Sequence, residues 1–256
     1  MSTNKGTKIN QLMSIAPKGA VLLSSWLTSH GYSFDLIKRY KHSGWLEPIG
    51  TGALMRSGDK IDIYGALYAL QAQKSLNVHI GGRSAFSISG KAHYLELEAK
   101  KIILFGDRHA YLPAWFIKHD WGIGIEYHAS DILPPDLGIE EVSVKEFTVK
   151  VSSSARALME CLYLAPDKQD LTECYELMEG MNNLRPNKVQ ELLESCASVK
   201  VKRLFLYLAE IHDHEWFKYL DLSKIDLGSG KRGIVKDGIL SKKYQITVPK
   251  NWSSND

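Results

Sequence analysis

The sequence predicts an α+β protein in which an N-terminal winged helix-turn-helix is followed by a mixed α/β C-terminal region. Three observations support this class. The chain has 256 residues, which is long for one small domain. Its beginning combines three helical patterns with a hairpin, and the remainder mixes helical and strand patterns. We place domain boundaries at residues 1–62, 63–150 and 151–256, and expect the middle region to pack with the C-terminal domain.

Three helices are predicted in the first segment. Apolar residues follow helical spacing over residues 9–16, and a second apolar face covers residues 20–27. Gly31 favours a left-handed stop after the second helix. Ser33 can then cap a third helix over residues 34–42, because its hydroxyl accepts from free backbone N–H groups.

The third predicted helix is basic, and a hairpin follows it. Residues 45–49 and 53–56 read as strands joined by a tight turn at 50–52, which is the pattern of a wing. A helix fits the major groove of DNA, and its cations replace the counterions condensed on phosphates. A small helical bundle that contacts protein is the alternative. The predicted DNA-binding residues are Lys38, Arg39, Lys41 and His42 on the helix, and Thr51 and Arg56 on the hairpin.

The formal net charge of +3 hides an uneven distribution. Residues 1–80 hold nine Lys/Arg and four Asp/Glu, whereas residues 81–150 hold eight and ten. Residues 152–198 hold four and eight, and residues 199–256 hold eleven and seven. A basic head and a basic tail around an acidic middle indicate a polyanion partner at one or both ends. Solvated charge without a partner is the alternative.

The middle region mixes strands with short helices. Gly81 and Gly82 form either a tight turn into a helix, which we favour, or a set of N–H groups for an anion. Apolar residues alternate beyond residue 142 with a slip between Val144 and Phe147, which predicts a bulge or the end of a strand. The other predicted elements are a helix at 63–72 and strands at 77–80 and 101–105.

Four helices and a hairpin are predicted in the C-terminal region. The helices fall near residues 154–164, 171–178, 186–196 and 201–211, and the hairpin at 231–248 has its turn near Asp237 and Gly238. Cations open the fourth helix, where they oppose the helix dipole. Either an anionic partner or the nearby Glu191 and Glu194 account for them. Residues 224–250 carry seven cations and two acids. We therefore predict a second basic surface made of Lys200, Lys202, Arg203, Lys231, Arg232, Lys242 and Lys243.

Motifs of enzymes are incomplete in this chain. Residues 228–232 resemble a phosphate loop, but Ile225 stands where the pattern needs glycine and Arg232 where it needs Ser or Thr. The His and Glu residues at 212–215 lack the ligand spacing of a zinc site. Cys-x-x-Cys pairs and a Gly-x-Ser-x-Gly elbow are also missing from the sequence. We predict no enzyme activity, no catalytic residue, no metal and no cofactor.

The expected location is the cytoplasm, with no membrane partner. No apolar run approaches the roughly 20 residues that a membrane-spanning helix needs, and residues 1–19 lack the pattern of a signal peptide. Cys161, Cys174 and Cys196 are an odd number at wide spacing, which favours a reducing compartment.

An ordered set of short motifs runs across residues 9–116. They are Trp26-Leu27, Gly31, Ser33, Leu36, Tyr40, Ser43-Gly44-Trp45-Leu46, Gly50, Gly52-Ala53, Gly65-Ala66-Leu67-Tyr68-Ala69-Leu70-Gln71, Val78-His79-Ile80-Gly81-Gly82-Arg83-Ser84-Ala85, Gly90, Ala92-His93-Tyr94-Leu95 and Leu112-Pro113-Ala114-Trp115-Phe116. The set resembles the AbiEi family, the antitoxins of bacterial type IV toxin–antitoxin abortive-infection systems. Residues 152–249 resemble the family more loosely.

The resemblance implies a function. Family members repress their own operon through an N-terminal winged helix that binds inverted repeats in double-stranded promoter DNA, and a C-terminal domain supplies antitoxicity. The implied partner is a nucleotidyltransferase-like toxin, AbiEii, with which no stable complex is required. Inverted repeats suggest that two copies bind each operator. The oligomeric state in solution is left undecided, with a monomer as one option. The alternative is a stand-alone winged-helix regulator with a sensing C-terminal domain.

Overall fold

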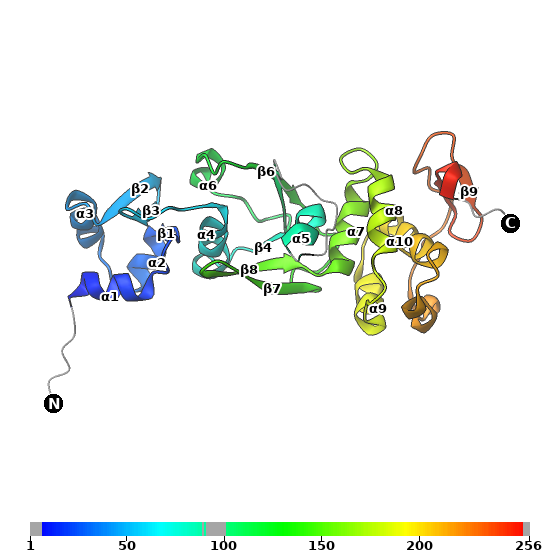
Figure 1. Cartoon of the computed structure of the whole chain (residues 1–256), viewed down its shortest axis with the longest axis horizontal. Coiled ribbons are helices and arrows are strands. Elements are labelled where there is room, and N and C mark those ends of the chain that lie inside the picture. The colour runs from blue at the N-terminus through cyan, green and yellow to red at the C-terminus, as the bar shows by residue number, and fades with distance from the viewer. Residues whose placement is uncertain (1–6, 89, 91–100, 253–256) are drawn as a thin grey trace, which may run out of the picture.

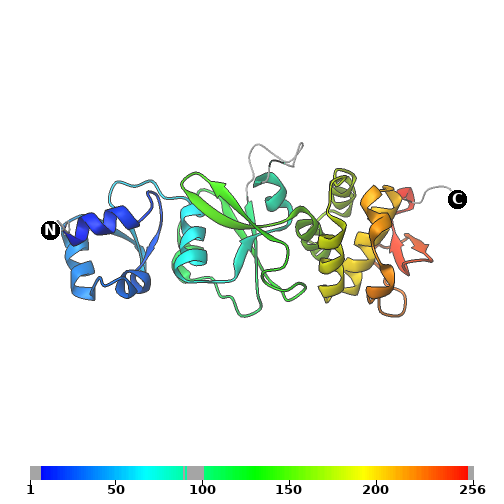
Figure 2. The ribbon, with the colours of Figure 1, turned by 90° about the horizontal axis from the view of Figure 1, so that it is seen from below.

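The computed structural model describes residues 7–88, 90 and 101–252, and it is elongated (Figure 1; Figure 2). An N-terminal unit lies at one end and a five-stranded sheet lies in the middle. A group of helices separates that sheet from a short hairpin at the other end. The protein is therefore a mixed α and β structure, as predicted. Residues 92–95, which belong to the motif set above, lie outside the described residues.

Residues 8–56 form three helices and a three-stranded antiparallel sheet in the order β1-β3-β2. The elements are α1 (Lys8–Ile15), β1 (Leu22–Leu23), α2 (Ser24–Ser29), α3 (Phe34–His42), β2 (Leu46–Gly50) and β3 (Ala53–Arg56). The first and third predicted helices and the hairpin are confirmed. The second helix is shorter than predicted, because Leu22 and Leu23 pair with Leu54 and Ala53 as a strand. A short buried apolar run fits a helix or a strand equally well, so only the pairing with the neighbouring strand shows which of the two forms.

The central sheet has five strands in the described part of the chain, in the order β6-β5-β4-β8-β7. They are β4 (Val78–Ile80), β5 (Lys101–Gly106), β6 (Gly124–Ala129), β7 (Ile139–Val144) and β8 (Phe147–Ser152). The pairs β5–β6 and β4–β8 are parallel, and the other two are antiparallel. The slip between Val144 and Phe147 is the end of one strand, because the two residues between them turn the chain with Lys145 at a φ of 55°. Strand β6 was not predicted.

Short helices accompany this sheet. Helix α4 (Ile63–Tyr68) continues as a π-helical turn η1 (Ala69–Gln73), which together match the predicted helix at 63–72. Helix α5 (Gly82–Ile88) follows β4, and α6 (Ala114–Lys118) lies between β5 and β6 along the chain.

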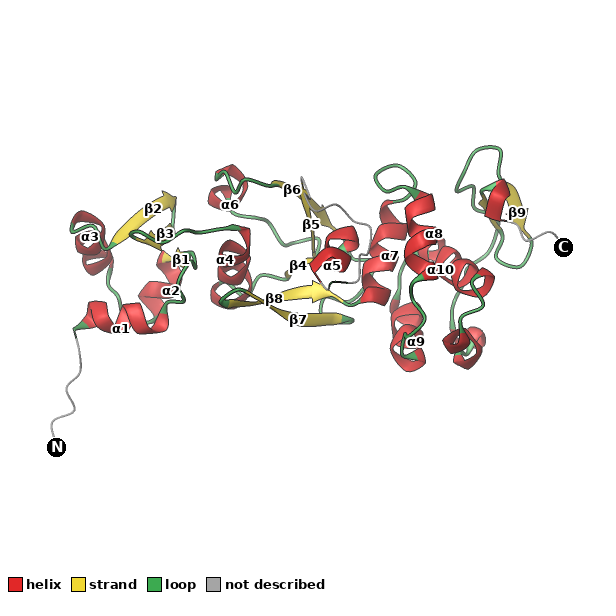
Figure 3. Cartoon of the chain, viewed as in Figure 1, coloured by secondary structure: helices red, strands yellow, loops and turns green. Residues whose placement is uncertain are grey.

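The C-terminal helices are confirmed as predicted. They are α7 (Ser154–Leu164), α8 (Leu171–Glu179), α9 (Pro186–Ser195) and α10 (Val199–Ile211), and Figure 3 shows them gathered beyond one end of the sheet. Short 3₁₀ turns follow at Glu215–Tyr219, Leu222–Lys224 and Lys250–Trp252. Helices α7 and α10 are buried along most of their length, because other elements surround them.

The C-terminal hairpin differs from the prediction. Its strands are β9 (Ile239–Ser241) and β10 (Ile246–Val248), so the turn lies at 242–245 rather than near Asp237. The predicted first strand at 233–235 is wrong. The N–H groups of Ile234 and Val235 donate to the Thr247 hydroxyl at 2.8 and 3.3 Å, so a side chain takes the place of a strand partner.

The N-terminal unit has its own small core and docks on the middle region. Residues that include Leu12, Leu27 and Ile37 form one apolar cluster, whereas a larger cluster runs from Ala20 and Val21 of the N-terminal unit through the middle region to Trp252. The Gln73 side chain adds a polar link between the N-terminal unit and the middle region, because it donates to Val21 O and accepts from Leu23 N, both at 2.8 Å. The division into three domains stays a prediction.

Candidate nucleic-acid interface

Helix α3 is held in place by a cap and by one apolar face. The Ser33 hydroxyl accepts from Leu36 N at 3.3 Å, so it satisfies a free donor of the first turn. Ile37 is buried, and Leu36 and Tyr40 are partly buried against the N-terminal core. Packing on this face alone leaves the opposite side of α3 turned to solvent.

The four predicted basic residues of α3 lie on that open side. Lys38, Arg39, Lys41 and His42 are all exposed. Among the described residues, none of them takes part in an ion pair, although the helix carries Asp35 in its first turn. Figure 1 places α3 at the outer end of the molecule, away from the central sheet. The helix therefore presents cationic side chains that are not engaged elsewhere in the described structure.

The two hairpin residues have different positions. Thr51 is exposed in the turn between β2 and β3, next to Gly50, which packs closely on Trp115 of α6. Arg56 lies at the base of the hairpin, where it pairs with Leu46. Its Nη1 donates to Ala16 O at 3.2 Å. Arg56 thus ties the hairpin to the end of α1, and we remove it from the candidate interface.

The predicted second basic surface is wrong at its centre. Lys202 and Arg203 are 4% and 2% exposed, because α10 is surrounded on all sides. The Arg203 guanidinium donates to four backbone carbonyls, which are Leu227 O, Gly228 O, Gly230 O and Gln245 O. Lys200 donates to the carbonyls of Tyr163 and Ala165 at 2.8 and 2.6 Å, and its burial lowers its pKa. Arg203 and Lys200 therefore bind backbone carbonyls of the protein itself.

Four residues of that predicted surface remain exposed: Lys231, Arg232, Lys242 and Lys243. Lys243 forms an ion pair with Glu210 of α10 and lies over the Tyr244 ring, 5.3 Å from its centroid. What is left is a small basic patch at the C-terminal hairpin, with one of its cations already paired.

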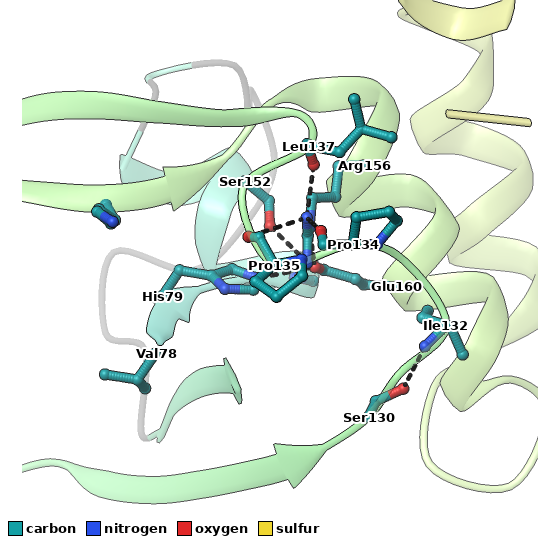
Figure 4. A network of polar contacts seen from close by, with 12 residues as sticks. Val78, His79, Ser130, Ile132, Pro134, Pro135, Leu137, Ser152, Arg156 and Glu160 are labelled. Carbon is teal, nitrogen blue, oxygen red and sulfur yellow. Dashed lines mark hydrogen bonds and ion pairs between the residues drawn. The ribbon is translucent and has the colours of Figure 1, made fainter. Parts of the chain in front are cut away.

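A buried polar network links the sheet to α7, and sequence reasoning missed it. Glu160 is 1% exposed. One of its oxygens accepts from Arg156 Nε at 2.9 Å and lies 2.8 Å from His79 Nε2. The other accepts from Gly82 N at 2.9 Å and from Ser152 Oγ at 2.8 Å (Figure 4). Burial would raise the pKa of Glu160, but the charges and hydrogen bonds of His79 and Arg156 lower it to about 2.

This network accounts for the turn at Gly82 and holds the loop that follows β6. The carboxylate of Glu160 takes the N–H group of Gly82, so the anion at that turn is supplied by the protein itself. Arg156 Nη1 also donates to Pro134 O at 2.7 Å and to Leu137 O, which fixes the loop that follows β6 (Figure 4). The residues of the network lie up to 81 positions apart in the chain, so no short sequence motif could have predicted it.

A cavity of about 260 Å³ adjoins the network. It lies where the parallel strands β5 and β6 end, and the residues that follow those strands line it. Asp107 and Asp131 stand at that end, His79 and Glu160 form part of the wall, and Phe105 adds an aromatic face. The carboxyl ends of parallel strands are a common place for ligands in α/β sheets.

Two family models match the sequence. One, described as "Transcriptional regulator, AbiEi antitoxin, Type IV TA system", matches residues 99–249. The other, described as "Transcriptional regulator, AbiEi antitoxin N-terminal domain", matches residues 5–97. The chain belongs to the AbiEi antitoxin family. The resemblance inferred from the ordered motifs is therefore confirmed, and the family is one of transcriptional regulators in type IV systems.

This AbiEi antitoxin is similar in fold to the RV2827C protein from Mycobacterium tuberculosis. The TM-score to that crystal structure is 0.58, with 14% sequence identity, 93% of this chain covered and 89% of the other. At this identity the likeness shows the fold alone. A comparison with curated proteins found no match.

The three cysteines of this AbiEi antitoxin are buried, and two C-terminal histidines lie among packed residues. His214 is buried with its Nε2 2.7 Å from Met178 O, and the His212 ring contacts the Tyr175 ring in a tilted arrangement with 4.3 Å between the centroids. Burial raises the pKa of each cysteine thiol. No group of three or more potential ligands is placed to hold a metal ion within residues 7–88 and 101–252. Across the same residues, no helix has the length and apolar character to cross a membrane.

Proposed function

We propose that this AbiEi antitoxin represses its own operon by binding promoter DNA through a winged helix formed by residues 8–56. The order helix, strand, helix, helix, hairpin supports this assignment, as does the sheet order β1-β3-β2. Helices α2 and α3 are joined by a short turn that contains Gly31 at a φ of 83°. Two helices joined in this way are the arrangement of a helix-turn-helix.

The observation that carries the proposal is the open cationic side of α3. Lys38, Arg39 and Lys41 are exposed and lack ion-pair partners among the described residues. A helix of this kind fits the major groove, and each cation that reaches a phosphate releases a counterion. Thr51 at the tip of the hairpin would meet the flanking backbone. Inverted repeats in the promoter would then hold two copies of the chain.

We further propose that residues 152–256 counter a nucleotidyltransferase-like toxin, without the need for a stable complex. The family descriptions support an antitoxin of a type IV system, and the choice of toxin rests on the family resemblance. On this view, DNA binding and antitoxicity lie at opposite ends of the molecule (Figure 1).

The test of DNA binding is a charge reversal on α3. Two lost phosphate contacts correspond to about a 30-fold weaker binding at 0.15 M salt, and to a salt slope that is smaller by about 1.8. We expect Lys38→Glu with Arg39→Glu to lose at least that much affinity for the DNA upstream of the operon. The matched control reverses Lys188 and Lys218, which are exposed at the other end of the chain. Equal losses in both variants would contradict the proposal.

The same variant tests whether the two activities are separate. Co-expressed with the neighbouring toxin, Lys38→Glu with Arg39→Glu should still restore growth, because residues 152–256 are unchanged. Loss of rescue in this variant, with normal amounts of folded protein, would contradict an antitoxin activity that is independent of the winged helix.

A second candidate function is a stand-alone regulator that senses a small molecule. The cavity of about 260 Å³ beside His79 and Asp107 favours it. A nucleotidyltransferase-like gene next to this one would favour the antitoxin, and its absence would favour the sensor. A metabolite that shifts the melting temperature of the wild type, and not of a variant with a bulky residue in place of Ser130, would support the sensor directly.

A further inference from the structure

The first turn of α3 differs in chemistry from the rest of the helix. Phe34 is 72% exposed, and Asp35 beside it is exposed as well. The cations begin only with Lys38, one turn later. A single exposed apolar side chain needs no explanation by itself. Its position on a proposed recognition helix gives it meaning, because the first turn of such a helix contacts base edges.

Helical geometry places Phe34 on the same side as the cations. The outward face of α3 carries two stripes at i, i+4 and i+7, which are Phe34, Lys38 and Lys41, and Asp35, Arg39 and His42. The inward face carries the buried Ile37. When the cations of the later turns reach the phosphates of the two strands, the first turn on the same face of α3 points into the major groove, between those strands.

Charge sets the first turn apart from the DNA backbone. Asp35 would be repelled by a phosphate, and Phe34 gains nothing from one. Neither side chain suits the backbone, whereas both suit base edges. In the major groove the C5-methyl group of thymine is the apolar feature of a base edge, and phenylalanine is among the side chains that contact it.

We infer that Phe34 is a specificity-determining residue that packs on the C5-methyl group of a thymine in the operator, while Lys38, Arg39 and Lys41 hold the flanking phosphates. This inference rests on the proposed function, since it needs α3 in the major groove. The Ser33 cap fixes the backbone of the first turn, and with it the direction in which the Cα–Cβ bond of Phe34 leaves the helix. Sequence preference and salt-dependent affinity then come from different turns of one helix.

The test removes one methyl group at a time from the DNA. Duplexes of the region upstream of the operon are made with single thymidines replaced by deoxyuridine, which lacks the C5-methyl group. Their affinities are compared with that of the unmodified duplex. A buried methyl group is worth about 0.8 kcal/mol, so the wild type should lose about fourfold at the contacted thymine. Phe34→Ala should bind both duplexes equally, and its salt slope should match that of the wild type.

Two further variants keep the test sharp. Phe34→Leu retains an apolar side chain and should keep part of the thymine preference. Tyr111→Ala removes another aromatic that is 77% exposed, outside the N-terminal unit, and should keep the full fourfold effect. Because Phe34 is mostly exposed, its replacement should leave the circular dichroism of the protein unchanged.

The possible outcomes separate this inference from the proposed function. If the wild type binds the promoter region but loses affinity at none of the deoxyuridine substitutions, the role of Phe34 alone is overturned. The role of Phe34 is also overturned if Phe34→Ala still loses fourfold affinity when the contacted thymidine is replaced. A wild type that binds the promoter region no better than a scrambled duplex overturns both proposals.

Discussion

The buried network around Glu160 offers a quantitative prediction for the change Glu160→Gln. The pKa of this carboxyl is about 2 in the folded protein, against an ordinary value of 4.5. At about 1.4 kcal/mol per pKa unit, its ionised form contributes on the order of 3 kcal/mol to folding. Removing one member of a buried ion pair costs about 3–5 kcal/mol by an independent route, because Arg156 would stay buried and unpaired. The two routes agree.

The assay is thermal and urea unfolding of the wild type and of Glu160→Gln at pH 7. A loss of about 3 kcal/mol lowers the melting temperature of a domain of this size by roughly 6–12 °C. The matched control is Glu191→Gln, since that carboxylate forms an exposed pair with Lys188 and should contribute less than about 1 kcal/mol.

The pH dependence gives a second readout of the same group. The folded pKa is lower than the unfolded one, so the contribution of Glu160 is complete above about pH 4.5 and is lost as the pH falls towards 2. The wild type should lose about 3 kcal/mol more than Glu160→Gln across that range. A melting temperature of Glu160→Gln within about 2 °C of the wild type at pH 7, or identical acid profiles, would refute the reasoning.

Three further predictions follow from single positions. Arg203→Lys should destabilise the protein by roughly 2–4 kcal/mol in urea unfolding, because an ammonium cannot serve the four carbonyls that the guanidinium binds; a change under about 1 kcal/mol would argue against that role. Gly65→Ala should loosen the N-terminal unit and speed limited proteolysis, since the new Cβ would lie 2.1 Å from Gly19 O, whereas Gly180→Ala, with its nearest contact at 3.7 Å, should not. Lys41→Ala should lower the salt slope of DNA binding by about 0.9 on every sequence tested, and a loss restricted to one sequence would point to base contact instead.

The local elements were accessible from the sequence because their signals are local. The spacing of apolar residues and the Ser33 cap gave the bounds of α3, and the same spacing located α7 to α10. The two-residue strand β1 was not predicted, since only its pairing with β3 distinguishes it from the start of a helix. The exposed side of α3 was likewise predictable, because one apolar stripe on a short helix leaves the remaining faces to solvent.

By itself, then, the sequence determined the family, the helical framework and the basic side of α3. Tertiary structure alone decided which cations are free. Arg203 and Lys200 read as surface charges in the sequence, yet backbone carbonyls from distant segments surround them. Glu160 looked unremarkable until folding brought His79 and Arg156 to it. A charge is compensated by whatever the fold places within hydrogen-bond distance, and those partners are separated too widely along the chain for any local pattern to record.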